Sequence, residues 1–153
     1  MQKQNLSIVY GDTMFTGFNY EALPLPAALR AAAQQVDFTA DQARAAVVGD
    51  ALRVVEYEMA EREAQAFKAA GYQGAVPPTV QAQVDAAGVT PKEATDSILM
   101  EASAWRGALY EIRAARLKGK QAALKAETHA EAELAADTAI AAIRASVVGV
   151  GNA

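Results

Sequence analysis

The chain has 153 residues and no cysteine, and its 14 Lys and Arg against 18 Asp and Glu give a formal net charge of −4. This composition excludes a disulfide framework and a thiol nucleophile, and it argues against capture of nucleic acid by the molecule as a whole. Hydrophobic residues make up 52% of the chain, but roughly a quarter of the chain is Ala and only 7% is aromatic. Because Ala buries little area, we expect neighbouring subunits to complete the core, which predicts a homo-oligomer.

The N-terminal residues show no signal-peptide pattern, and no window approaches the ~18 apolar residues of a membrane span. We therefore expect a chain that is neither secreted by that route nor inserted in a membrane.

Two short β-prone runs, residues 6–10 and 14–18, flank the turn-forming pair Gly11-Asp12 and predict a β-hairpin. Two strands alone are marginal, so residues 1–38 are expected to form an arm of short strands and a connector. Four aromatic residues gather there, namely Tyr10, Phe15, Phe18 and Tyr20. They favour an arm that docks on a partner, although packing back onto its own helices fits equally well.

Residues 39–153 are expected to form a helical domain, which makes the fold class mainly α. Thr39 to Gln42 is a candidate capping box for a helix over about 40–70 that ends at Gly71, with Gly49 as a weak point inside it. Further helices are predicted at about 79–87, 91–126 and 130–148. A short helix near 27–36 is expected in the connector.

The strongest start signal is Thr90-Pro91-Lys92-Glu93, a capping box with Pro at the first helical position. The helix that follows carries an apolar seam of Ile98, Ala102, Trp105, Leu109 and Ile112. Trp105 is interpreted as a core anchor, with a partner-interface anchor as the alternative.

The last two predicted helices carry opposite charges on either side of a turn at 127–129. Basic residues precede it (Arg113, Arg116, Lys118, Lys120, Lys125), and acidic residues follow it (Glu127, Glu131, Glu133, Asp137). This pattern predicts an antiparallel helical hairpin, resembling a coiled coil, in which the basic half lies beside the acidic half.

The sequence gives no support to catalysis, a metal site or a cofactor. His129 is the only histidine and is expected to be an exposed turn residue. Glu56, Glu58, Glu61 and Glu63 are interpreted as a solvated helix face. A basic ridge (Arg106, Arg113, Arg116, Lys120) leaves open a small helical nucleic-acid-binding regulator as an alternative function.

Two motifs carry a resemblance to a known group of proteins: FKAAGY-x-G-x-VPP at residues 67–78, and W-x3-L-x2-I-R-x2-R at residues 105–116. Over about residues 60–145 the chain resembles small Ala-rich proteins encoded among the tail genes of tailed bacteriophages and prophages. The resemblance implies a structural component of a tail or tail fibre, located in the virion, that binds other tail or fibre proteins. A fibre-assembly chaperone absent from the mature virion is the alternative. The expected partner contacts are the four N-terminal aromatic residues, the loop at Pro77 and Pro78, and Trp105.

Overall fold

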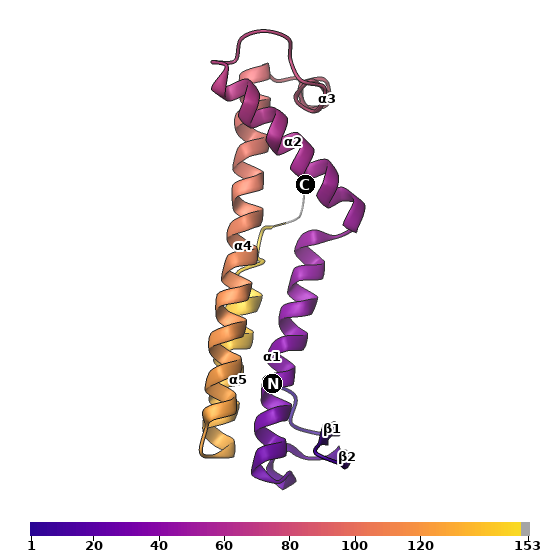
Figure 1. Cartoon of the computed structure of the whole chain (residues 1–153), viewed down its shortest axis with the longest axis vertical. Helices are drawn as coiled ribbons and strands as arrows, with labels where there is room; N and C mark the ends of the chain where they lie inside the picture. The colour runs from indigo at the N-terminus through magenta and orange to yellow at the C-terminus, as the bar shows by residue number, and fades with distance from the viewer. Residues whose placement is uncertain (151–153) are drawn as a thin grey trace. The chain divides into compact units, whose positions relative to one another are not determined.

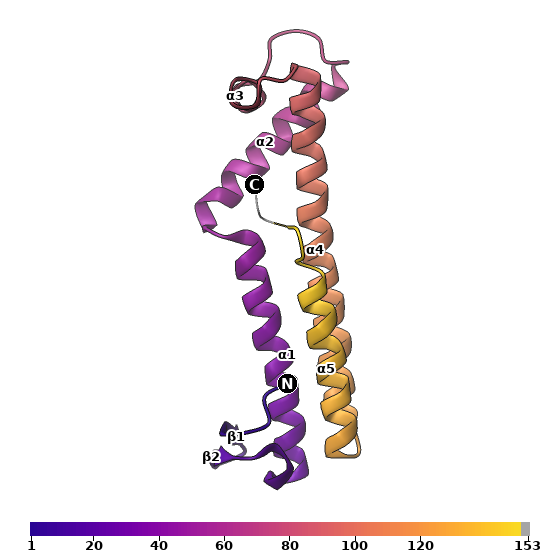
Figure 2. The same cartoon turned by 180° about the vertical axis from the view of Figure 1, so that it is seen from behind.

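The computed structural model describes residues 1–150, and within them the chain is mainly helical with one short N-terminal hairpin (Figures 1 and 2). The elements follow in the order β1 (Leu6–Tyr10), β2 (Thr13–Phe18), the 3-10 turn η1 (Tyr20–Ala22), α1 (Leu25–Val48), α2 (Ala51–Ala69), α3 (Pro78–Ala87), α4 (Pro91–Lys125) and α5 (His129–Ala145). In the described part of the chain, no helix is both long and apolar enough to cross a membrane.

The chain divides into two compact units. Unit 1 consists of Met1–Val47 and Ala108–Gly149, and unit 2 consists mainly of Val48–Gly107. Helix α4 contributes its first half to unit 2 and its second half to unit 1.

The predicted hairpin is confirmed. Strands β1 and β2 pair antiparallel, with Tyr10 opposite Thr13 and Ile8 opposite Phe15. Gly11 has a φ of +58° at the first position of the two-residue turn, where glycine has no steric penalty. Near the other end the register shifts between Leu6 and Ser7, and Gly17, with a φ of +76°, is the extra residue of a bulge.

Unit 1 has its core between α1, the second half of α4, and α5. Its largest fully buried aliphatic side chains are Val36, Ile112 and Ile143, and most of the remaining core positions of α1 and α5 are alanines. The short turn between α4 and α5 reverses the chain, so that α5 returns along α4 in both views (Figures 1 and 2). At Gly119 the approach is so close that an added Cβ would overlap the Cβ of Ala139.

The prediction of a helix start near Thr39 is wrong. Helix α1 runs continuously from Leu25 to Val48, and Thr39 lies inside it, with its hydroxyl donating to the carbonyl of Gln35 at 2.8 Å instead of capping a new helix. The break falls at Gly49, which adopts a φ of +62°. Asp50 then caps α2, because its carboxylate accepts from the backbone N–H of Leu52 at 2.7 Å.

Unit 2 packs α2, α3 and the first half of α4 around a small core of Ala64, Val80 and Ala94. Glu63 of α2 binds the start of α3, since its carboxylate accepts from both the backbone N–H (3.0 Å) and the hydroxyl (2.6 Å) of Thr79. These hydrogen bonds hold the pKa of Glu63 below its ordinary value. Two of the four glutamates assigned to a solvated face therefore have structural partners, because Glu61 also pairs with Arg106.

Candidate functional site

The hairpin of unit 1 carries a group of exposed apolar side chains. Four of its side chains are substantially exposed: Val9 (58%), Tyr10 (46%), Met14 (66%) and Phe18 (38%). Phe15 is half-buried and meets Phe18 edge to face, with 5.4 Å between ring centroids. Three of the four N-terminal aromatic residues predicted to contact a partner therefore lie at least partly open to solvent.

The fourth aromatic residue, Tyr20, is fully buried and anchors the hairpin to its own chain. Its ring lies edge to face on His129 at 5.5 Å, and its hydroxyl donates to the carbonyl of His129 at 3.3 Å. Nε2 of His129 lies 2.9 Å from the carbonyl of Leu23. The expectation that His129 is simply an exposed turn residue is therefore wrong, since the residue is half-buried and joins the start of α5 to the end of the hairpin.

Burial raises the pKa of Tyr20 to about 12, and the nearby carboxylates Glu133 and Glu21 add to the shift. Because the folded state holds this proton more tightly than the unfolded state, Tyr20 stabilises the fold less as the pH rises from about 10 to about 12. We expect Tyr20→Phe to remove one late phenolate transition in an absorbance titration and to reduce the loss of stability over that range. An unchanged absorbance titration in Tyr20→Phe would contradict the assignment.

The segment before β1 is also fixed to unit 1. The backbone of Gln2 makes two hydrogen bonds with the side-chain amide of Gln35 on α1, one at 2.6 Å and one at 2.9 Å, in the way that a neighbouring strand would. Lys3 forms an ion pair with Glu133 of α5 at 2.5 Å, and its carbonyl accepts from the backbone N–H of Tyr20 at 2.8 Å. Residues on both sides of the hairpin therefore hold it on its own chain, with β2 facing outward.

The basic residues of α4 pair with partners other than those expected. Asp37 of α1 accepts from Arg116 at 3.0 Å and from Lys120 at 2.5 Å. Burial of Asp37 would by itself raise its pKa, but the two cations outweigh this effect and hold the pKa below its ordinary value. Helix α5 does return along α4, as predicted (Figures 1 and 2), but within residues 1–150 no ion pair joins the basic half of α4 to the acidic residues of α5.

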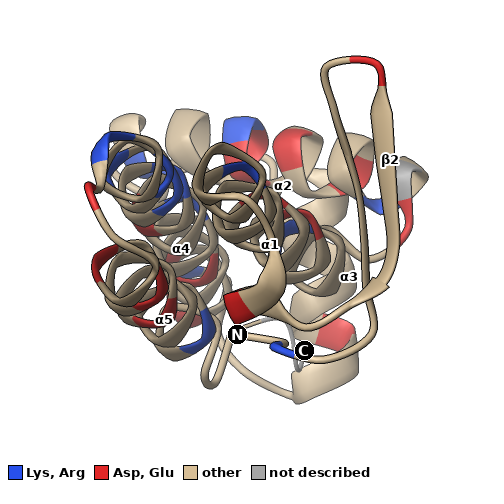
Figure 3. Ribbon diagram, turned by 90° about the horizontal axis from the view of Figure 1, so that it is seen from below, with Lys and Arg blue, Asp and Glu red and all other residues tan. Residues whose placement is uncertain are grey.

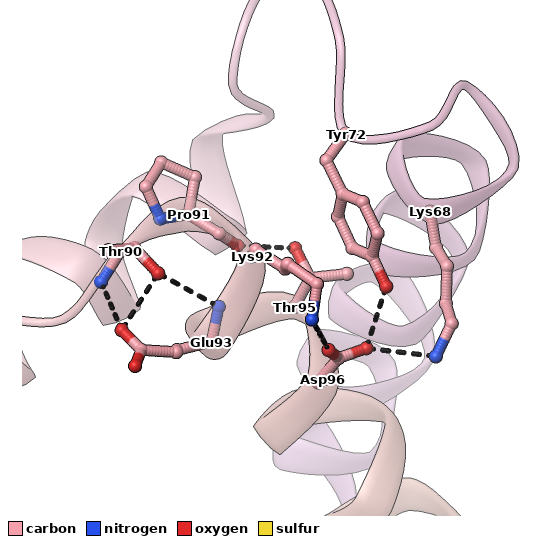
Figure 4. Close-up of polar contacts among 8 residues, drawn as sticks. All are labelled: Lys68, Tyr72, Thr90, Pro91, Lys92, Glu93, Thr95 and Asp96. Atoms are coloured by element: carbon pink, nitrogen blue, oxygen red, sulfur yellow. Dashed lines mark hydrogen bonds and ion pairs between the residues drawn. The ribbon is translucent and has the colours of Figure 1, made fainter.

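Unit 2 contains a polar cluster around Asp96 (Figure 4). The carboxylate of Asp96 accepts from Lys68 at 2.8 Å, Tyr72 at 2.9 Å and Lys92 at 3.0 Å. The hydrogen bonds from Lys68, Lys92 and Tyr72 hold the pKa of Asp96 far below its usual range. Tyr72 has a φ of +60°, uncommon for a residue other than glycine, and its bond to Asp96 offsets part of that strain. The cluster therefore fixes the turn after α2 on the first turn of α4.

The Asp96 cluster predicts a dependence of stability on pH. A lowered folded-state pKa stabilises the fold above the unfolded-state pKa of about 4, and this stabilisation is lost as the pH falls through the folded-state pKa. We expect Asp96→Asn to lower the melting temperature at neutral pH and to weaken its acid dependence, as followed by circular dichroism. Asp85→Asn is the matched control, because Asp85 accepts only from Gln81 and has no cationic partner within the described residues. An equal effect of both substitutions would contradict the role of Asp96.

The remaining predicted contact residues lie in unit 2. Pro77 is half-buried and precedes α3, whereas Pro78 is exposed at the first position of that helix. Trp105 is half-buried, and its indole Nε1 is buried without a hydrogen-bond partner. Trp105 is not a member of the small core of unit 2, so its interpretation as a core anchor holds only in part.

Two hollows border the N-terminal segment of unit 1, with volumes of about 260 and 300 Å³. The first lies between the hairpin and α1 and is lined by apolar and amide side chains, among them Leu6, Ile8, Gln35 and Phe38. The second lies toward α5 and includes Arg144. Neither brings together a nucleophile with a base. Within residues 1–150, no group of three or more His, Cys, Asp or Glu side chains could hold a metal ion.

The sequence analysis did not predict two sets of polar contacts, the cluster around Asp96 and the hydrogen bonds between Gln2 and Gln35. Asp96 lies four residues after Lys92, and this spacing signals a helical ion pair, but nothing in the sequence shows that Lys68 and Tyr72 join it. Gln35 carries no signal at all, since its role depends on the backbone of Gln2, which is distant in sequence. Comparison of the chain with protein-family models, curated proteins and solved structures gave no match.

Proposed function

We propose that this chain is a structural component of a bacteriophage tail or tail fibre that acts by protein-protein assembly and performs no catalysis. One observation carries the proposal. The hairpin is fixed to its own unit by Tyr20 and Gln2, yet it leaves Val9, Tyr10, Met14 and Phe18 exposed. A small chain that holds apolar side chains in water on an ordered element presents a surface for another protein. The tail assignment rests on the resemblance carried by residues 67–78 and 105–116.

The second half of α4 and α5 would serve as the rigid body of such a subunit, in the manner of an antiparallel coiled-coil pair. Support comes from the close approach of Gly119 to Ala139 and from the buried Ile112 and Ile143. The loop at Pro77 and Pro78 and the half-buried Trp105 are further proposed contacts.

The charge arrangement weighs against the nucleic-acid-binding alternative. Arg116 and Lys120 are both committed to Asp37, and Arg106 pairs with Glu61. Of the four residues of the basic ridge, Arg113 alone is exposed rather than half-buried. Neutralised cations contribute little to the release of counterions that drives phosphate binding.

The test is the protein composition of purified particles of a phage that encodes this chain, measured by quantitative mass spectrometry. A structural component should be present in fixed stoichiometry with the other tail proteins. A fibre-assembly chaperone should be absent from the particles but bound to a fibre protein in the lysate. That result would overturn the structural role and support the chaperone role. Absence from both the particles and fibre-protein complexes would overturn the proposal.

A further inference from the structure

The outer edge of β2 has no partner in the described chain. In the described chain the sheet contains only β1 and β2, and no residue of β2 is buried, whereas Leu6 and Ile8 of β1 are. The hairpin lies beside the N-terminal half of α1, on the side away from α5 (Figures 1 and 2). A free strand edge presents backbone groups that can extend the sheet.

The register identifies which backbone groups point outward. Tyr10 and Thr13 flank the two-residue turn and form a hydrogen-bonded pair, and hydrogen-bonded pairs then alternate along an antiparallel ladder. The backbone N–H groups of Met14 and Thr16 therefore point to the free edge of β2. By the same alternation, the N–H of Ser7, directly opposite Thr16, points to the outer edge of β1.

The charge pattern allows a second copy of this chain to occupy this edge, because no charge on either strand would repel an identical strand. Neither strand carries a charged residue, and Figure 3 shows the hairpin tan along both strands. Exposed edge strands commonly carry a charge or proline that prevents pairing, and β2 has neither. The one charge of the hairpin is Asp12 in the turn. If two copies of β2 pair antiparallel, their turns lie at opposite ends of the new ladder and the two Asp12 carboxylates stay apart.

The side chains fit the same arrangement. Phe15 and Phe18 form an edge-to-face pair, with Phe15 opposite the buried Ile8. If two copies joined through β2, the Phe15–Phe18 pair of the second copy would lie beside the Phe15–Phe18 pair of the first. Both pairs would lie on the same face of the sheet. A two-stranded hairpin would become part of a four-stranded sheet, which exceeds the three strands that a sheet with an apolar face needs for independent stability.

We propose that β2 is a docking edge whose occupant is β2 of a second copy of this chain, paired antiparallel across a two-fold axis. An isologous contact of this kind uses one surface twice and closes after two copies. The inference rests on the assembly function proposed above and names the contact through which copies of the chain join.

The test compares two proline substitutions that block opposite edges of the hairpin. Proline removes a backbone donor, so Thr16→Pro blocks the outer edge of β2 and Ser7→Pro blocks the outer edge of β1, while neither removes a bond of the hairpin. Sedimentation velocity of the full chain over a concentration series should give a dimer for the wild type and for Ser7→Pro. Thr16→Pro should lower the apparent mass twofold. Near-UV circular dichroism checks that Tyr20 stays packed in both variants.

Hydrogen exchange of the unmodified chain gives a second measurement that needs no substitution. The amides of Met14 and Thr16 should exchange slowly at high concentration and quickly after dilution, while the amides of Ile8 and Phe15 should not respond. A wild type that is monomeric at every concentration, a dimer that survives Thr16→Pro, or a dimer lost only in Ser7→Pro would each overturn the inference.

These outcomes separate this inference from the proposed function. If the isolated chain is a monomer but is present in purified particles, the pairing of two β2 strands is overturned and the tail function is not. The free edge of β2 would then bind a strand of another protein. A β2-dependent dimer that is absent from particles and from fibre-protein complexes would overturn the tail function alone.

Discussion

Replacing Tyr20 with alanine is expected to lower the free energy of unfolding by about 3–5 kcal/mol, the usual cost of removing a fully buried aromatic side chain. Tyr20 is completely buried and contacts His129 through both its ring and its hydroxyl, so its removal leaves a cavity where η1 meets the start of α5. Urea unfolding followed by circular dichroism measures the loss.

The matched control is Tyr10→Ala, which removes the same side chain from the exposed strand β1. Because Tyr10 is 46% exposed, we expect a change within about 0.5 kcal/mol when both variants are measured at the same protein concentration. Equal losses for the two variants would show that Tyr20 does not anchor the hairpin on unit 1.

The Gly119→Ala substitution is expected to destabilise the chain by about 1–2 kcal/mol, although alanine is the better helix former. The added Cβ would overlap the Cβ of Ala139 and lie 3.5 Å from its Cα, so α4 and α5 must separate. Overpacking of this kind costs about 1–3 kcal/mol, and the gain in helix propensity offsets only part of it.

Gly107 provides the control on the same helix, since a Cβ there meets nothing within 4 Å. Gly107→Ala should therefore raise the free energy of unfolding by up to about 1 kcal/mol. Combining Gly119→Ala with Ala139→Gly should recover stability relative to the sum of the two single variants. A stabilising Gly119→Ala, or additive effects in the double variant, would contradict the close contact.

Local signals in the sequence predicted most of the secondary structure. The capping box at the start of α4 is confirmed, because Glu93 accepts from the backbone N–H of Thr90 at 2.9 Å and Thr90 accepts from the N–H of Glu93 at 3.3 Å (Figure 4). The hairpin turn at Gly11 and the helix end at Gly71 follow the same kind of local rule. Each of these signals lies within a few residues of the structure that it determines.

The errors arose where two local signals competed. Thr39 carries a capping signal and Gly49 is a weak point inside the expected helix, and no local signal shows which of the two forms the boundary. The apolar residues Val36, Ala40, Ala43 and Val47 form one continuous buried face of α1, so packing carries the helix through Thr39 and the boundary falls at Gly49. Burial of a whole face outweighs the one or two hydrogen bonds of a cap.

The residues of the candidate site on the hairpin could be named from the sequence, but their arrangement could not. The concentration of aromatic residues drew attention to the hairpin, where Tyr10 and Phe18 are exposed and Phe15 is half-buried. The sequence could not show that Tyr20 turns inward while Tyr10 and Phe18 stay in solvent, because that division depends on where α5 returns. The partner of the basic residues was unpredictable for the same reason, because Asp37 lies 79 residues before Arg116 in the sequence.

The attachment of the N-terminal segment to α5 has a consequence for biosynthesis. Lys3 and Tyr20 leave the ribosome long before Glu133 and His129, their partners in the folded chain. The nascent hairpin therefore spends most of translation without the helix that anchors it, with two uncharged strands in contact with solvent. Sequence-distant contacts of this kind form late and slow the overall reaction. If β2 pairs with a second copy as proposed, newly made chains on one polysome would be able to pair before each hairpin is anchored.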